Sequence, residues 1–371
     1  MPAILINVSQ SRTADLRSLQ IGQQVLDSPF IVAPMAGMTD TAFRRLVKRH
    51  GGCGLVVTEM VSSEGLVRGI DRTLEFAEYT EEERPVSIQI FGSDPMKMAD
   101  AAQIVEGLGA DIVDVNMGCP VPKIAKHNAG CSLMREPEHA ASVIAAMTKR
   151  VSIPVTVKMR AGWNEQSINA PELARRVEDA GASAVAVHGR TAAQSYSGQS
   201  DWGLIDRVAD SVRIPVLGSG DCLEPEDILS RMETGVSGVL VGRGVLRNPW
   251  ILAQAADLAA GRPARRVTLH DRGQFLLEYV DLLLTGDESE PLGFRHRAGQ
   301  KESSVINPKS LGERARHERW VVNKLRALMS WYSKGLHNGG HLRTDINAAS
   351  SVAHARDIVE GFFDLRAAAV R

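Results

Sequence analysis

The stretch DIVDVNMGCPVPKIAKHNAG, residues 111–130, joins a short apolar run to a loop with a cysteine between a glycine and a proline. The run is rich in β-branched residues, as in parallel strands that are buried on both faces. The loop that follows contains Asn116, Cys119, Lys123 and Lys126. The stretch therefore predicts a buried parallel strand whose carboxyl end carries side chains that could take part in catalysis or binding.

The same pattern of apolar run, polar turn and helix-like segment extends over residues 30–244. The eight predicted strands are FIVAPM (30–35), GLVVTEM (54–60), PVSIQIFG (85–92), DIVDVNMG (111–118), IPVTVKMR (153–160), AVAVHGR (184–190), IPVLGSGD (214–221) and GVLVGRG (238–244). Eight strand–helix units predict an α/β fold, a TIM (β/α)8 barrel. A doubly wound sheet is the alternative, but the GxGxxG motif that favours it is missing after the first strand.

The pattern changes near residue 262, beyond which long amphipathic segments replace the short strands. We predict helices in 268–284, 319–336 and 349–366, from the apolar residues at helical spacing. The chain thus divides into a catalytic barrel domain, 1–262, and a small all-helical C-terminal domain, 263–371. Between the first two of these helices, about 285–318, the chain is polar and punctuated by Gly and Pro, which predicts a long mobile loop.

Composition and charge narrow the classes of function. The 371 residues are 44% hydrophobic and lack an apolar run long enough for a membrane span or a secretory signal. The four cysteines show no CxxC spacing, so we expect no disulfide framework, no metal site and a cytoplasmic location. Residues 291–371 carry 14 Lys or Arg against 7 Asp or Glu, whereas 1–290 carry 29 against 37. A basic tail on an acidic chain suggests a polyanionic partner, although an ordinary solvated helical surface explains it equally well.

Nearly every predicted strand ends in a polar or charged group, which is where a TIM barrel carries its active site. Each such residue has a structural explanation on its own, but Lys158 inside an apolar strand is costly unless it is paired. Gly-rich turns follow the last two strands at Gly220 and Gly242, where barrels commonly bind a phosphate. With Arg243 nearby, these turns predict a phosphate-bearing cofactor, and Lys158 and His188 would face it.

The sequence resembles the tRNA-dihydrouridine synthase family. The similarity rests on APMAGMTDTAFR, QIFG, VNMGCPVPKIAKHNAG, VKMRAGW, VHGRTAAQSYSG and GRGVLRNPW, in the family's order and spacing over about residues 28–252. The APMAGMTD segment leans toward the bacterial B-type branch. The resemblance implies an FMN-bearing barrel and a helical tRNA-binding domain. It also implies NADPH, or NADH, as reductant, hydride transfer from reduced FMN to C6 of a uridine, and a proton from Cys119 to C5.

The resemblance also assigns roles to individual residues. The implied cofactor-binding positions are Pro34, Met35, Ala36, Gln89, Asn116, Lys158, His188, Ser219, Gly220, Asp221, Gly242 and Arg243. The RNA-binding candidates are Lys123, Lys126, Arg190, Arg319, Lys324 and Arg326. A thiol suits the acid role because its ordinary pKa, about 8.5, leaves it protonated near pH 7. We therefore expect Cys119 not to be activated as a thiolate, and the other three cysteines to serve packing.

The chain departs from the family pattern at two positions. Ser219 stands where relatives commonly have Asn, and Ala192 where many have Arg, which puts one flavin contact and one RNA contact in doubt. We expect a monomer. The runner-up is an FMN barrel of the dihydroorotate dehydrogenase type acting on a small molecule, and a third possibility is a non-catalytic RNA-binding barrel. The small-molecule alternative predicts no salt-sensitive tRNA binding, and the non-catalytic alternative predicts a colourless protein.

Overall fold

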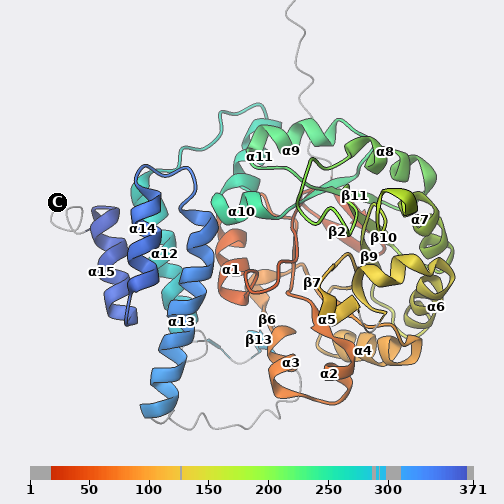
Figure 1. Cartoon of the computed structure of the whole chain (residues 1–371), viewed down its shortest axis with the longest axis horizontal. Helices are drawn as coiled ribbons and strands as arrows, with labels where there is room; N and C mark the ends of the chain where they lie inside the picture. Colours follow the sequence, from red (N-terminus) through yellow and green to blue (C-terminus); the bar gives the residue numbers. More distant parts are fainter. Residues whose placement is uncertain (1–17, 126–127, 286–289, 292, 298–310, 366–371) are drawn as a thin grey trace, which may run out of the picture.

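The computed structural model describes residues 18–125, 128–285, 290–291, 293–297 and 311–365 (Figure 1). A barrel of strands ringed by helices forms one side of the molecule, and the helices α12 to α15 form the other. None of the helices in these ranges is long and apolar enough to cross a membrane.

Eight parallel strands close into the barrel, so the predicted TIM fold is confirmed. They are β3 (Phe30–Val32), β4 (Leu55–Val57), β7 (Val86–Phe91), β8 (Ile112–Met117), β9 (Val155–Arg160), β10 (Ala184–His188), β11 (Val216–Ser219) and β12 (Gly238–Val241). Pairing runs in chain order from β3 to β12, and the barrel closes where β12 pairs with β3. Each strand lies within one of the eight apolar runs, because a strand buried on both faces has few polar residues.

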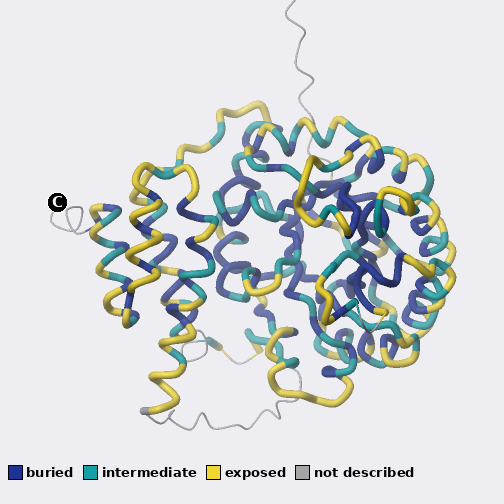
Figure 2. The backbone as a smooth tube through the Cα atoms, in the orientation of Figure 1, coloured by how far each residue is buried: buried dark blue, intermediate teal, exposed yellow. Residues whose placement is uncertain are grey.

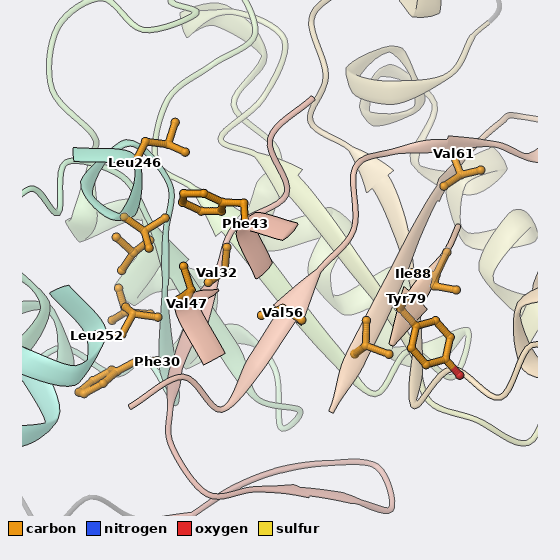
Figure 3. Packing of buried hydrophobic residues seen from close by; sticks show 14 of the residues in the cluster. Phe30, Val32, Phe43, Val47, Val56, Val61, Tyr79, Ile88, Leu246 and Leu252 are labelled. Atoms are coloured by element: carbon orange, nitrogen blue, oxygen red, sulfur yellow. The ribbon is translucent and has the colours of Figure 1, made fainter. Parts of the chain in front are cut away.

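Helices cover the outside of the barrel. They are α1 (Thr41–His50), α4 (Pro95–Gly107), α6 (Pro137–Thr148), α7 (Ala170–Asp179), α8 (Trp202–Ser211), α9 (Pro225–Met232), α10 (Arg243–Arg247) and α11 (Ile251–Ala259). Their starts carry the expected signals: the carboxylates of Asp40, Asp94 and Asp201 accept hydrogen bonds from first-turn N–H groups of α1, α4 and α8. Figure 3 shows part of the resulting core, in which Phe43 and Val47 of α1 pack near the barrel strands.

Short elements decorate this frame. They are β1 (Leu19–Ile21), β2 (Gln24–Leu26), β5 (Val61–Ser62), β6 (Tyr79–Thr80), β13 (Arg295–His296), α2 (Ser63–Val67), α3 (Asp71–Phe76), α5 (Pro122–Ala125) and 3₁₀ turns at Glu81–Glu83, Gly130–Arg135 and Glu165–Ser167. The β1–β2 hairpin packs Leu19, Ile21 and Leu26 against the inward-facing apolar residues of the barrel. The end of the barrel interior that the hairpin covers is therefore apolar. The polar residues of a functional site are expected at the opposite end.

Four helices make up the C-terminal region: α12 (Leu269–Thr285), α13 (Leu311–Tyr332), α14 (Gly339–Ala348) and α15 (Val352–Phe362). Of the predicted helices, α12, α13 and α15 are present, whereas α14 was not predicted. Phe275 of α12 stacks on Tyr332 of α13 and lies edge-on to Phe43 of the barrel helix α1. The two parts therefore share one hydrophobic core, and the predicted division at 262–263 falls in the connection between α11 and α12.

The predicted loop of about 285–318 is only partly described. Residues 286–289, 292 and 298–310 lie outside the described ranges. Arg295 and His296 form β13, which pairs antiparallel with β6. The loop prediction is wrong for 311–318, because α13 begins at Leu311. This first part of α13 is almost entirely exposed, so it has no apolar stripe by which a helix could be predicted (Figure 2).

Candidate active site

The carboxyl ends of the barrel strands bring the predicted site residues together. Pro34, Met35 and Ala36 follow β3, and Gln89 lies in β7. Strands β8 to β12 contribute the remaining positions, which are Asn116, Cys119, Lys158, His188, Ser219, Gly220, Asp221, Gly242 and Arg243. In a closed parallel barrel these strand ends face one mouth, so residues spread over some 200 positions of the chain form one site.

The loop after β8 holds Cys119 in a sharply fixed turn. Asn116 Oδ1 accepts hydrogen bonds from the N–H groups of Gly118 (3.1 Å) and Cys119 (2.9 Å). The carbonyl of Cys119 accepts from the N–H of Cys131 at 3.1 Å. Gly130 has a φ of +61°, and a Cβ there would lie 2.7 Å from the Cys119 carbonyl oxygen. Gly130 is therefore required for the shape of the turn, a role that was not predicted from the sequence.

The Cys119 thiol keeps its proton at neutral pH. Burial raises its pKa above the ordinary value, which outweighs the opposing effects of the Val121 N–H and of the cations Arg160 and Lys158. This agrees with the expectation that Cys119 is not activated as a thiolate. Burial likewise raises the pKa of Cys131 to about 11, and the Cys131 side chain is fully buried, as expected of a packing residue.

Lys158 projects from β9 into the barrel interior. It lines a small internal cavity together with Asp114 and Thr156. Burial and the neighbouring Arg160 lower its pKa to about 8, although Asp114 opposes the shift. Among the described residues, no hydrogen bond or ion pair joins its ammonium to another group. A cation held in this way is available to an anionic ligand at the barrel mouth.

His188 at the end of β10 is neutral. Burial, together with the cations Lys158 and Arg160, lowers its pKa to about 2. Its Nδ1 is buried and has no hydrogen-bond partner among the residues described. Because buried polar atoms are nearly always hydrogen-bonded, this nitrogen is a candidate for a ligand contact.

Asp221 organises the turn after β11. Its carboxylate lies 2.8 Å from Arg190 and 3.0 Å from Arg243, and it accepts from the N–H of Ser200 at 2.7 Å. Arg190 also donates to the carbonyls of Ser197 and Gly198, yet its Nη1 is buried without a partner in the described chain. These arginines and an unused donor suit an anionic group such as a phosphate.

Ser219 differs from the prediction in detail, because its hydroxyl is engaged inside the protein. Ser219 Oγ donates to the carbonyl of Leu240 on the neighbouring strand at 3.2 Å. A cofactor contact by this side chain would require that bond to break. The neighbouring Gly220 has a φ of +129°, and a Cβ there would lie 2.3 Å from Ser200 Oγ, so the close turn needs glycine.

The structure does not favour an RNA contact for three of the six RNA-binding candidates. Arg190 is only 2% exposed and is paired with Asp221. Lys324 is 14% exposed, with its ammonium 3.2 Å from Asp40. Arg326 donates to the carbonyl of Ala349, which directly follows α14, at 2.7 Å. Lys324 and Arg326 would have to give up these partners to bind an RNA phosphate, whereas the buried Arg190, whose Nη1 has no partner in the described chain, is placed for a ligand inside the barrel mouth.

The other RNA-binding candidates are Lys123, Arg319 and Lys126. Lys123 and Arg319 are exposed. Lys126 lies outside the described residues. No group of three or more His, Cys, Asp or Glu side chains in the described ranges is arranged to hold a metal ion.

Asp114, which lies two residues before Asn116 on the same face of β8, was not predicted from the sequence. Asp114 is 6% exposed and accepts hydrogen bonds from Gln89 and Thr156. A carboxylate in the otherwise apolar run DIVDV was the signal for it, since buried carboxylates occur only with partners.

A barrel with a half-buried thiol, a half-buried lysine and paired arginines at one mouth defines the chain as an enzyme rather than a scaffold. The family model for dihydrouridine synthase matches residues 31–298. The chain belongs to the dihydrouridine synthase family.

Individual relatives support this, one of them over nearly the whole chain. A probable tRNA-dihydrouridine synthase of Rickettsia bellii (strain RML369-C) is 34% identical over 93% of this chain and 98% of its own length. A probable tRNA-dihydrouridine synthase of Rhodobacter capsulatus is 44% identical over 70% of this chain and 81% of its own. The tRNA-dihydrouridine synthase B of Xanthomonas campestris pv. campestris is 38% identical over 65% and 73%. The resemblance based on the strand-end motifs is thus confirmed at the level of the family.

A solved structure shares the architecture. Histamine dehydrogenase from Rhizobium sp. 4-9 superposes with a TM-score of 0.53 at 13% identity, covering 73% of this chain and 51% of that one. At this identity the likeness shows the barrel fold alone.

Proposed function

We propose that the chain reduces the C5–C6 double bond of a uridine in tRNA, with FMN as cofactor and NADPH or NADH as reductant. The observation that carries the proposal is the protonated Cys119 thiol at the same barrel mouth as the half-buried Lys158 and the unpartnered His188 Nδ1. Family membership supports it, because the relatives named above are described as tRNA-dihydrouridine synthase B or as probable tRNA-dihydrouridine synthases.

The residues at the barrel mouth fit a flavin mononucleotide. Arg190 and Arg243 with the Gly220 turn would hold the phosphate, and Arg190 Nη1 offers an unused buried donor. Lys158 and His188 would face the ring system from β9 and β10. Bound FMN would supply the hydride for C6 of the uracil. A cationic Lys158 nearby stabilises negative charge on the ring, and the neutral His188 adds no further charge.

Cys119 supplies the proton for C5 in this proposal. A general acid must be protonated at working pH and must be held within reach of the atom that it protonates. Burial keeps the thiol protonated, and the hydrogen bonds of Asn116 to the Gly118–Cys119 turn fix its position. Cys119 would therefore act from the loop above the barrel while the uracil lies between the loop and the cofactor.

The tRNA would be bound by exposed cations outside the barrel mouth. Arg314, Arg316 and Arg319 are exposed on the first half of α13, which lies along the molecule's edge (Figure 2). Trp320 beside them is 43% exposed and lies under the ammonium of Lys324. Lys123 is exposed on the short helix α5 beyond Cys119. Contacts with phosphates at these places would offset the energy needed to extract a uridine from the folded tRNA. We further propose that the enzyme is a monomer of the cytoplasm.

The decisive experiment supplies purified, flavin-loaded protein with NADPH and tRNA from a strain that lacks its gene. We expect dihydrouridine in the digested tRNA by mass spectrometry, and tRNA binding that weakens as salt rises. A yellow protein that reduces a free pyrimidine acid but never tRNA would support the small-molecule alternative. A colourless protein that binds tRNA without reducing it would support a non-catalytic barrel.

A further inference from the structure

A continuous chain of hydrogen bonds runs from the barrel interior to the Cys119 turn. Thr156 Oγ1 donates to Asp114 Oδ1 at 2.6 Å, and Gln89 Nε2 donates to Asp114 Oδ2 at 2.7 Å. Asn116 Nδ2 donates to Gln89 Oε1 at 2.7 Å. Asn116 Oδ1 accepts from the N–H of Cys119 at 2.9 Å. The buried carboxylate is thus linked to the thiol-bearing residue through two side-chain amides.

Strand register builds this chain. Asp114 of β8 lies opposite Gln89 of β7 on one side and opposite Thr156 of β9 on the other. Asn116 lies two residues further along β8, so its side chain is on the same face as that of Asp114. Gln89, Asp114 and Asn116 are between 1% and 8% exposed, so no member can exchange a lost partner for bulk water.

The groups at the two ends of this chain of hydrogen bonds determine which side chain donates and which accepts in each bond. Backbone N–H groups of the Cys119 turn can only donate, so Asn116 must present its oxygen to them and its NH₂ to Gln89. Gln89 must then present its oxygen to Asn116 and its NH₂ to the next group. That group must accept, and a carboxylate is the side chain best suited to accept from both Gln89 and Thr156. A carboxylate at position 114 therefore completes the pattern of donors and acceptors that begins at the Cys119 turn.

We propose that Asp114 is a positioning residue for the acid Cys119, which it orients through Gln89 and Asn116. This inference rests on the proposed function for the role of Cys119, but the hydrogen-bond chain does not. The carboxylate also fixes which atom each amide turns toward the barrel mouth. Neither Asp114 nor Thr156 belongs to the set of residues proposed to touch the cofactor or the uracil.

The first test measures the thiol itself. We expect Asp114→Leu to raise the rate at which iodoacetamide alkylates Cys119 roughly tenfold at fixed pH, because a turn that has lost its anchor opens more often. Peptide mass spectrometry separates Cys119 from the buried Cys222, whose alkylation should not change. Asp114→Asn should behave like the unaltered chain, because a carboxamide can still accept from Gln89 and donate to Thr156 Oγ1.

Further variants separate positioning from general damage. Ser87→Ala is a matched control, because Ser87 lies in β7 inside the barrel but takes no part in the chain. Gln89→Leu cuts the chain at its middle and should raise Cys119 alkylation as Asp114→Leu does, while the double variant should add no more. In a single-turnover assay Asp114→Leu should retain tRNA affinity and slow dihydrouridine formation roughly 100-fold, as about 1 Å of misplacement does.

The outcomes are distinguishable. Unchanged Cys119 alkylation in a folded Asp114→Leu protein, or in Gln89→Leu if the first variant does not fold, overturns the positioning role. If alkylation shifts as expected but the unaltered enzyme makes no dihydrouridine, the positioning chain stands and the proposed function fails.

Discussion

The ammonium of Lys324 lies 3.2 Å from the carboxylate of Asp40, although α13 and the start of α1 are far apart in the sequence. Glu59 lies 3.4 Å from the same ammonium, and the hydroxyl of Tyr279 donates to Asp40 at 2.8 Å. Lys324 also donates to the carbonyl of Gly37 at 3.2 Å. This cluster ties the C-terminal helices to the loop after β3 that carries the predicted flavin contacts.

Replacing Lys324 with Met should destabilise the protein, because it leaves the carboxylates of Asp40 and Glu59 buried without their cation. We expect a loss of roughly 3 kcal/mol in the free energy of unfolding, as is typical for breaking a buried pair. Denaturant titration measures it. Arg319→Met, on the exposed part of the same helix, should change stability by less than about 0.5 kcal/mol. Equal unfolding midpoints for the two variants would contradict the structural role of Lys324.

Replacing Cys119 with Ala should abolish most uridine reduction while flavin and tRNA binding persist. Without the thiol, the turn contains no acid that can protonate C5 of the uracil. Loss of a general acid typically lowers the rate about 10²- to 10⁴-fold. Dihydrouridine formation in a single turnover is the measurement. Cys131→Ala is the matched control, because Cys131 neighbours the same turn but is fully buried. Full product formation by Cys119→Ala would rule out the assigned acid.

The barrel and the position of the thiol could be predicted from the sequence, because both depend on short local patterns of residues. A strand buried on both faces shows itself as a short apolar run, and the polar residue that ends it falls at the barrel mouth. The place of Cys119 at the strand end followed from the residues beside it, whereas its role as the acid was implied by the family resemblance. The hairpin of β1 and β2 escaped because each strand has three residues, too few to show a period.

The pairing of Lys324 could not be predicted because it depends on contacts across the chain. Glu59 is separated from Lys324 by 265 positions, and nothing in either segment reveals the other. A lysine in a basic helix has the same sequence pattern whether it binds RNA or neutralises two buried carboxylates. Arg190 and Arg326 illustrate the same limit, since their partners are Asp221 and a helix-end carbonyl.

The affinity for FMN should fall as the pH rises above about 8. The pKa of Lys158 in the free protein is lowered to about 8, so its ammonium is present below that pH and is progressively lost above it. The electrostatic attraction between Lys158 and an anionic ligand is lost when the ammonium loses its proton. Flavin fluorescence titrations at pH 7 and pH 9, in a Cys119→Ala background that removes thiol ionisation, measure the effect. Lys158→Met should bind more weakly at pH 7 and show little further loss at pH 9. An identical pH dependence in both proteins would remove Lys158 from the flavin site.

Arg319 and Arg326 should respond differently to charge reversal, although they lie on the same helix. Arg319 is exposed, so Arg319→Glu should weaken tRNA binding and reduce the slope of log affinity against log salt by about 1, without loss of stability. Arg326 donates to the carbonyl of Ala349, so Arg326→Glu should lower the free energy of unfolding by about 1–3 kcal/mol through the unsatisfied carbonyl. Filter binding at several salt concentrations and denaturant titration separate the two effects. A reduced salt slope for Arg326→Glu with unchanged stability would contradict the structural role of Arg326, because it would mean that the helix-end contact gives way to a phosphate when tRNA binds.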